Sequence, residues 1–216
     1  MKRIVPFLAA FAVALAACSA DSPVPTTAHM SHAGGLMLSD LTQASQAQTL
    51  NDLRNLTAPL HDVDAALAQQ YNLFVLPPAT EGDGCISDPT LGGMGYHYTR
   101  GDNLFDDAID LLNPEFLVYA PKKGPRKDDI ARTRLAAVEY FLPFTAKFPA
   151  PGKPGFTKAP SLHDFPSTSG LPDVEFTPTD RFGGWMFHIW LWEDNPAGMF
   201  ENFNNSVRLC QPVGPA

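Results

Sequence analysis

The chain has 216 residues, 44% of them apolar, with 15 basic and 23 acidic side chains and a formal net charge of −8. An acidic chain lacks the attraction for phosphates and anionic headgroups, so nucleic acid and an electrostatic membrane anchor are both excluded as expected partners. The length and the apolar fraction suit one domain with an ordinary core and a short additional segment.

The N-terminus has the pattern of a secretory signal peptide. Lys2 and Arg3 precede an apolar run, residues 4–17, which is shorter than the about 20 residues of a membrane-spanning helix. The run ends in LAAC (15–18), which resembles the bacterial lipobox. That resemblance implies removal of residues 1–17, lipidation of Cys18 and anchoring of the mature chain by its acyl chains. The alternative is an ordinary signal cleavage near Ala20.

Ser19 follows the cysteine where inner-membrane lipoproteins have Asp, so the same resemblance implies an outer-membrane protein that faces the periplasm. Residues 18–38 are small, polar and interrupted by Pro and Gly, which predicts a flexible tether. Residues 39–216 then form a single domain.

Two helices are predicted after the tether. Ser39 is a candidate N-cap for residues 41–56, and Thr57 for residues 59–71, where Pro59 suits the first turn. In the second helix an apolar stripe recurs at spacings of three and four residues. His61 lies at the edge of this stripe, where it is either a packing residue or a ligand.

Four segments alternate as strands do, namely residues 92–98, 114–121, 134–144 and 187–192. The connections resemble hairpins, and residues 145–181 form a long excursion rich in Pro and Gly that either covers a pocket or only connects. The predicted fold class is therefore α+β, with N-terminal helices packed on a curved antiparallel sheet.

Two cysteines remain after Cys18. Cys85 and Cys210 make an even pair, and in an oxidising compartment the simplest reading of such a pair is a disulfide. A free pair or two metal ligands are the alternatives, although no Cys-x-x-Cys spacing supports a metal.

Three polar residues lie on otherwise apolar strands. They are His97, Glu139 and His188, and a carboxylate among apolar neighbours needs either solvent or a partner. Two imidazoles and a carboxylate suit a divalent transition metal, and His61 is a candidate fourth ligand from the helix. In the alternative interpretation each histidine makes one hydrogen bond and packs.

Aromatic side chains on the strands suggest either a ligand pocket or core packing. Alternation places Met94, Tyr96 and Tyr98 on one side of their strand, and puts Trp190 and Trp192 on the face of His188. A wider set of candidates also includes Trp185 and Tyr140. On the strand predicted at residues 134–144, we expect one face to be shared by Leu135, Ala137, Glu139 and Phe141.

Four stretches together resemble a group of exported bacterial proteins of unknown function: CISDPTLGGMGYHY, NPEFLVYAP, LAAVEYFLPF and FHIWLWEDNPAGMFENFN followed by Cys210. The resemblance covers residues 57–210 and implies one domain and a Cys85–Cys210 pair. It implies no activity. This chain departs from the group in its lipobox and in residues 145–181.

Three functions remain open from the sequence. The first is a membrane-tethered protein that binds a metal ion or a small ligand, and the second is an enzyme that uses the same metal with an open coordination position. The third is a structural or interaction lipoprotein whose aromatic strand is plain core. No motif of nucleophilic or phosphate chemistry is present.

Overall fold

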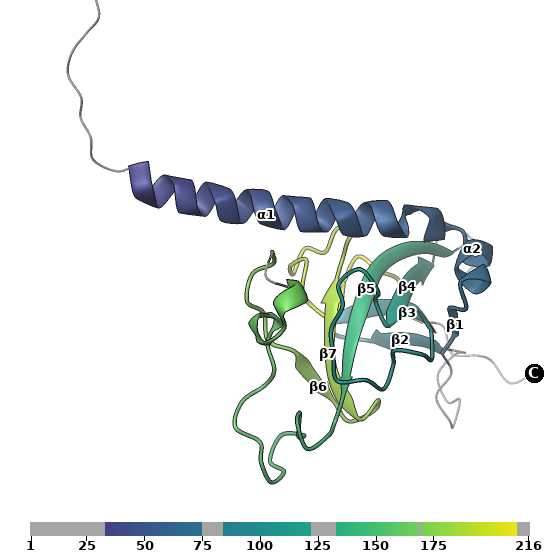
Figure 1. Cartoon of the computed structure of the whole chain (residues 1–216). Helices are drawn as coiled ribbons and strands as arrows, with labels where there is room; N and C mark the ends of the chain where they lie inside the picture. The colour runs from purple at the N-terminus through teal and green to yellow at the C-terminus, as the bar shows by residue number, and fades with distance from the viewer. Residues whose placement is uncertain (1–32, 75–83, 122–132, 169, 211–216) are drawn as a thin grey trace, which may run out of the picture.

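The computed structural model describes residues 33–74, 84–121, 133–168 and 170–210. They form a seven-stranded antiparallel sheet, which is not closed into a barrel, together with one long helix and several short helical segments (Figure 1). The broad α+β prediction is confirmed, with more sheet than helix. The predicted signal peptide, Cys18 and the first part of the predicted tether lie outside the described residues.

Helix α1 spans Ala33–Thr57, and the 3-10 helix η1 (Ala58–His61) and helix α2 (Val63–Ala68) follow it directly. The helix begins at Ala33, so the last six residues of the predicted tether are helical. Ser39 lies within the helix rather than at its N-cap. Pro59 falls in η1, where it has no hydrogen bond to break, and Asp62 caps α2 by accepting from the N–H of Asp64. The second predicted helix is thus divided into two short pieces.

The strands are β1 (Asn72–Leu73), β2 (Cys85–Asp88), β3 (Gly92–Thr99), β4 (Phe116–Pro121), β5 (Thr133–Pro143), β6 (Thr177–Thr179) and β7 (Gly184–Ile189). Their order is β1-β3-β4-β5-β7-β6, with β2 also paired to β3. The four predicted strands correspond to the long central ones. The short strands β1, β2 and β6 were not expected, because two to four residues carry no clear alternation.

Each face of the sheet carries its own core. One face packs Leu50 and Leu53 of α1 and the segment after β5, whose 3-10 helices are η4 (Leu162–Asp164) and η5 (Pro166–Thr168), against the largest buried cluster. The second face holds two smaller clusters around Phe116 and Val118. Because the central strands are buried on both sides, their sequence reads as a nearly continuous apolar run.

The disulfide between Cys85 and Cys210 is formed, with the Cα atoms 5.8 Å apart. It ties β2 to the C-terminal strap, by which we mean residues 199–210. The strap runs against β3, where Gly93 and Asn204 form an antiparallel bridge. A Cβ on Gly93 would lie 2.6 Å from the carbonyl oxygen of Arg208, so this close approach requires glycine.

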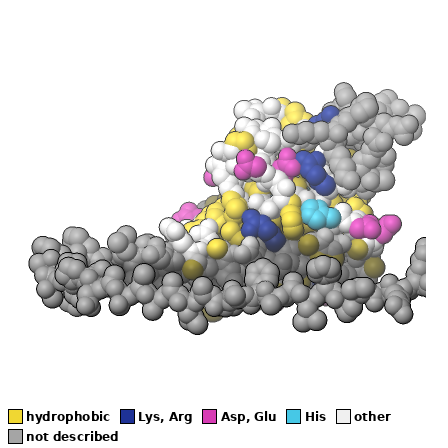
Figure 2. Space-filling view, turned by 90° about the horizontal axis from the view of Figure 1, so that it is seen from above, with side chains coloured by type: hydrophobic (Ala, Val, Ile, Leu, Met, Phe, Trp, Pro, Cys, Tyr) yellow, Lys and Arg dark blue, Asp and Glu magenta, His cyan; other side chains and the backbone are white. Residues whose placement is uncertain are grey.

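No helix in the described part of the chain is long and apolar enough to cross a membrane. Seen from above, the described part of this face mixes basic, acidic and apolar side chains (Figure 2).

Candidate metal centre

His97, Glu139 and His188 come together on the second face of the sheet. They lie on β3, β5 and β7, and each side chain is at most 1% exposed. Glu139 and His188 are direct cross-strand partners, whereas His97 reaches Glu139 across β4. The predicted trio is therefore confirmed as a spatial group, with one donor atom of each residue within 4.8 Å of the others.

Two bulges determine which neighbouring side chains share this face with the trio. In β3 the pairing with β2 slips at Met94, because Ile86 pairs with Gly95 while Ser87 pairs with Gly93. Gly95 has a φ of +122°, a conformation that favours glycine. Met94 consequently packs on the face of His97 and not with Tyr96, which corrects the simple alternation.

The second bulge lies at Ala136 in β5. Val118 of β4 pairs with Ala137, and the next residue, Tyr119, pairs with Leu135. Ala136 therefore has no pairing partner in β4. Leu135 therefore joins the large core on the opposite face, although alternation placed it beside Glu139. An extra residue shifts the period of two, and only local backbone geometry reveals it.

Glu139 stands between the two imidazoles. Its Oε2 lies 2.9 Å from Nε2 of His97 and 3.2 Å from Nε2 of His188. Both distances are short enough for an ion pair, yet among the described residues none of these three atoms completes an aligned hydrogen bond. Two imidazole nitrogens and a carboxylate oxygen that lie this close together have the composition and proximity of a metal-ligand set.

The other nitrogen of each ring has its own acceptor. Nδ1 of His97 donates to the carbonyl oxygen of Gly95 at 3.1 Å. Nδ1 of His188 lies 3.2 Å from Oδ1 of Asn202 in the strap and donates to it. In a neutral imidazole with the proton on Nδ1, Nε2 carries the lone pair. Both lone pairs then face the carboxylate, which is itself an acceptor.

Electrostatics favours a charged carboxylate in this place. Burial opposes ionisation of Glu139, but charge attraction and hydrogen bonds from His188 and His97, which require protonated rings, outweigh it and lower its pKa to about 2. A buried anion needs a compensating cation. Either a proton on one of the rings or a metal ion between the three side chains supplies this positive charge.

The surroundings are apolar. The side chains of Phe116, Phe141, Met94 and Met186 share this face in one buried cluster, and Phe182 packs partly exposed against it. The rings of Phe116 and Phe182 lie 6.0 and 6.4 Å from the ring of His97. Such a wall excludes water and strengthens any interaction between the trio and a cation.

The remaining predicted residues lie elsewhere. His61 is in η1 on the other side of the molecule, where its ring meets Trp192 edge-on at 4.5 Å, so it does not join the trio. Tyr96 and Tyr98 belong to the large core of the first face. Trp190 stacks on His188 on the second face. The four aromatic residues expected to line one pocket are thus divided between two faces of the sheet.

Two participants were missed by sequence reasoning. Asn202 lies in a loop 14 residues after His188, where nothing in the local pattern links the two. Gly95 contributes only its backbone oxygen, although a glycine inside an otherwise bulky strand was a signal for a bulge.

Comparisons with protein-family models, with curated proteins and with solved structures found no match for this chain.

Proposed function

We propose that the protein binds a divalent transition metal ion through His97, Glu139 and His188. The observation that carries this proposal is the convergence of three buried metal-ligating side chains, in which Oε2 of Glu139 lies 2.9 Å from Nε2 of His97 and 3.2 Å from Nε2 of His188. Zinc lies about 2.0–2.2 Å from such ligands, which places neighbouring ligand atoms of a tetrahedral site about 3.3–3.6 Å from each other. The separations of 2.9 and 3.2 Å are shorter, so the trio opens by a few tenths of an ångström to take the ion.

The outer contacts support the same proposal. Histidines that bind metals commonly donate their second N–H to a carbonyl, which fixes the tautomer and directs the lone pair. His97 and His188 both do so, toward Gly95 and Asn202. Two imidazoles and a carboxylate suit Zn²⁺ or Fe²⁺, and three protein ligands leave a coordination position that a water or a further group can fill.

Metal content is the first experiment. The disulfide-bonded protein, purified untagged, is expected to hold about one equivalent of metal after reconstitution with Zn²⁺, measured by mass spectrometry of the elements. Glu139→Gln and His188→Ala are expected to lose it while circular dichroism remains unchanged. His163→Ala is the matched control, because that histidine is half exposed and contacts Asp173 far from the trio.

Substitution with Co²⁺ adds a direct view of the ligands, since its visible absorption reports the number and kind of donors. A stoichiometric spectrum that Glu139→Gln abolishes supports the proposal. If the folded protein takes up neither Zn²⁺ nor Co²⁺, the proton is the bridging cation and the trio is a structural polar network of the core.

We further infer a lipid-anchored protein of the cell envelope, with Cys18 acylated, the following residues as tether and the N-terminal helices packed on a curved sheet. The lipobox pattern supports the anchor, and the burial of Leu50 and Leu53 against the core supports the packing. Cys18→Ser is expected to move the protein from the membrane fraction to the soluble fraction. If mass spectrometry of the N-terminal peptide finds that the bond between Ala17 and Cys18 is intact, the lipid anchor is contradicted.

A further inference from the structure

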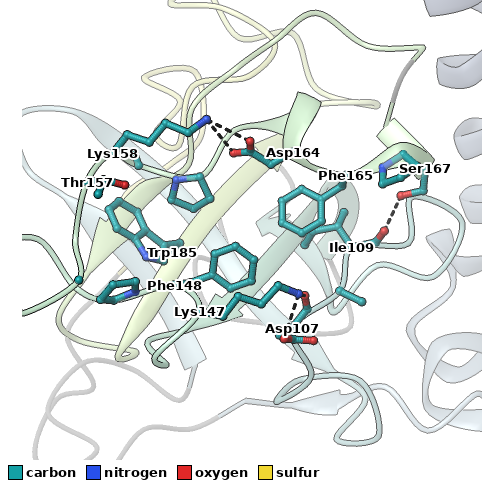
Figure 3. Close-up of a pocket in the computed structure, with 16 residues that line it drawn as sticks. Asp107, Ile109, Lys147, Phe148, Thr157, Lys158, Asp164, Phe165, Ser167 and Trp185 are labelled. Carbon is teal, nitrogen blue, oxygen red and sulfur yellow. Dashed lines mark hydrogen bonds and ion pairs between the residues drawn. The ribbon is translucent and has the colours of Figure 1, made fainter.

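A separate cavity opens on the first face of the sheet, opposite the proposed metal centre. Its volume is about 570 Å³, within the range of sites for small organic ligands. The Pro- and Gly-rich excursion after β5 and the loop around Ile109 provide most of the lining, and Trp185 of β7 lies at the end of the cavity away from Ile109 (Figure 3). The excursion, whose role the sequence left open, therefore builds a cavity.

Trp185 brings an unused hydrogen-bond donor to this cavity. The side chain is 1% exposed, and its Nε1 has no acceptor among the described residues. The other two tryptophans differ, since Nε1 of Trp190 donates to the carbonyl oxygen of Glu201 at 2.5 Å and Nε1 of Trp192 donates to Oγ1 of Thr57 at 3.1 Å. A buried N–H without an acceptor costs free energy that a bound acceptor recovers.

Neighbouring rings hold the indole in place. Phe156 stacks on it with an interplanar angle of 13° and a centroid distance of 5.9 Å, and Phe144 meets it edge-on at 5.8 Å. The indole is therefore confined between rings that offer no acceptor. Across the cavity, Phe148 and Phe165 lie 5.8 Å apart and present a second aromatic wall.

The charges at the rim are compensated. Nζ of Lys147 lies 3.0 Å from a carboxylate oxygen of Asp107, and Nζ of Lys158 lies 3.0 Å from one of Asp164 (Figure 3). Each lysine thus has its own counter-ion, and the rim offers no net charge to a ligand. The interior combines aromatic walls with the indole N–H of Trp185 and the hydroxyl groups of Thr157 and Ser167, and Ser167 already donates to the carbonyl oxygen of Ile109.

We propose that this cavity binds an uncharged aromatic molecule that carries one hydrogen-bond acceptor, a carbonyl or ether oxygen placed against Nε1 of Trp185. The walls supply apolar contact with the ring, the paired rim charges disfavour an ionic ligand, and the indole N–H fixes the orientation. This site is independent of the trio on the other face and of any metal bound there.

Acetophenone and ethylbenzene make a matched pair of probes, because they share size and ring and differ in the carbonyl. The ¹⁵N–¹H spectrum of the full chain contains three indole signals, one for each tryptophan. Acetophenone is expected to move the Trp185 signal downfield and leave those of Trp190 and Trp192 in place. It is expected to bind about tenfold more tightly than ethylbenzene, the equivalent of one hydrogen bond.

Trp185→Phe identifies the signal and removes the donor while keeping an aromatic ring, so the two probes are expected to bind this variant equally. Phe148→Ala is a second variant that leaves the indole intact, and it is expected to weaken both probes. If neither probe moves the Trp185 signal, or if ethylbenzene moves it as far as acetophenone does, the proposal is overturned. Repeating the titration on Glu139→Gln is expected to give the same result.

Discussion

Asn202 determines, through a single contact, which nitrogen of His188 faces Glu139. Its Oδ1 accepts from Nδ1 at 3.2 Å and leaves the lone pair on Nε2. Asn202→Ala is expected to weaken Zn²⁺ affinity by about 10- to 100-fold, because the imidazole then loses its fixed tautomer and orientation. Competition with a chromophoric chelator measures this change.

Two variants accompany that measurement. Asn202→Asp keeps an acceptor oxygen in place and is expected to retain most of the affinity, while Asn205→Ala alters an exposed amide of the same strap. Equal affinity of Asn202→Ala and the wild type would show that Asn202 has no part in orienting the ring.

Glu115 is a second buried carboxyl, 1% exposed, and it has no imidazole beside it. Burial raises its pKa to about 9, although its own N–H and that of Phe141 oppose the rise by favouring the carboxylate. The folded chain therefore keeps a proton that the unfolded chain releases above about pH 4.3. The stability linked to this proton is fully present below that pH and is lost as pH rises toward 9.

Glu115→Gln removes this dependence, because an amide does not ionise. The variant is expected to gain stability over the wild type as pH rises, by at most about 1.4 kcal/mol per pH unit between pH 5 and 8. Urea unfolding at both pH values measures the difference. The exposed Glu175→Gln is the control, and a Glu115→Gln difference that is equal at both pH values would contradict the raised pKa.

At the scale of the element, the bulge in β3 shapes the site. Gly95 adopts a φ of +122°, and a Cβ there would lie 2.5 Å from the carbonyl oxygen of Tyr119 in β4. Its own carbonyl oxygen accepts from Nδ1 of His97. One glycine thus sets the strand pairing and orients a proposed ligand.

Gly95→Ala is expected to destabilise the fold by about 1–3 kcal/mol through backbone strain, and to weaken Zn²⁺ binding through the displaced His97. Gly101→Ala is the matched control, since a Cβ there meets nothing within 4 Å. Thermal unfolding and chelator competition read the two effects. If Gly95→Ala is as stable as Gly101→Ala, the backbone at the bulge does not require glycine and the prediction is wrong.

The long strands and the pairing of His97, Glu139 and His188 were predictable from the sequence, because bulky alternation is strong there and a polar residue on an apolar strand needs a partner. The faces were harder to predict. Leu135 and Met94 were assigned to the wrong side, since a bulge adds one residue without changing the kind of residue present. His61 was misplaced because a helix stripe gives no information about distant strands.

For the whole molecule, the disulfide is the main long-range tie. It closes a separation of 125 residues, and in the chain-entropy model a loop of that length contributes about 5 kcal/mol. The double variant Cys85→Ser with Cys210→Ser is expected to lose up to this amount in urea unfolding. Because the strap also carries Asn202, the Zn²⁺ affinity of the double variant is expected to fall as well.

The comparison is with the oxidised wild type under non-reducing conditions, and chemical reduction of the wild type is expected to reproduce both effects. Wild-type Zn²⁺ affinity in the double variant would show that the strap stays in place without the disulfide, through contacts such as the bridge between Gly93 and Asn204.

The order of the site residues along the chain has a consequence for biosynthesis. His97 and Glu139 leave the ribosome first, whereas His188 and its partner Asn202 follow later, and β7 must pair with β5 before His188 faces Glu139. A nascent chain that stops before β7 therefore offers one imidazole and one carboxylate, a weak chelator. An ion held by the proposed site is therefore acquired only after β7 has been made and paired, in whichever compartment the chain folds.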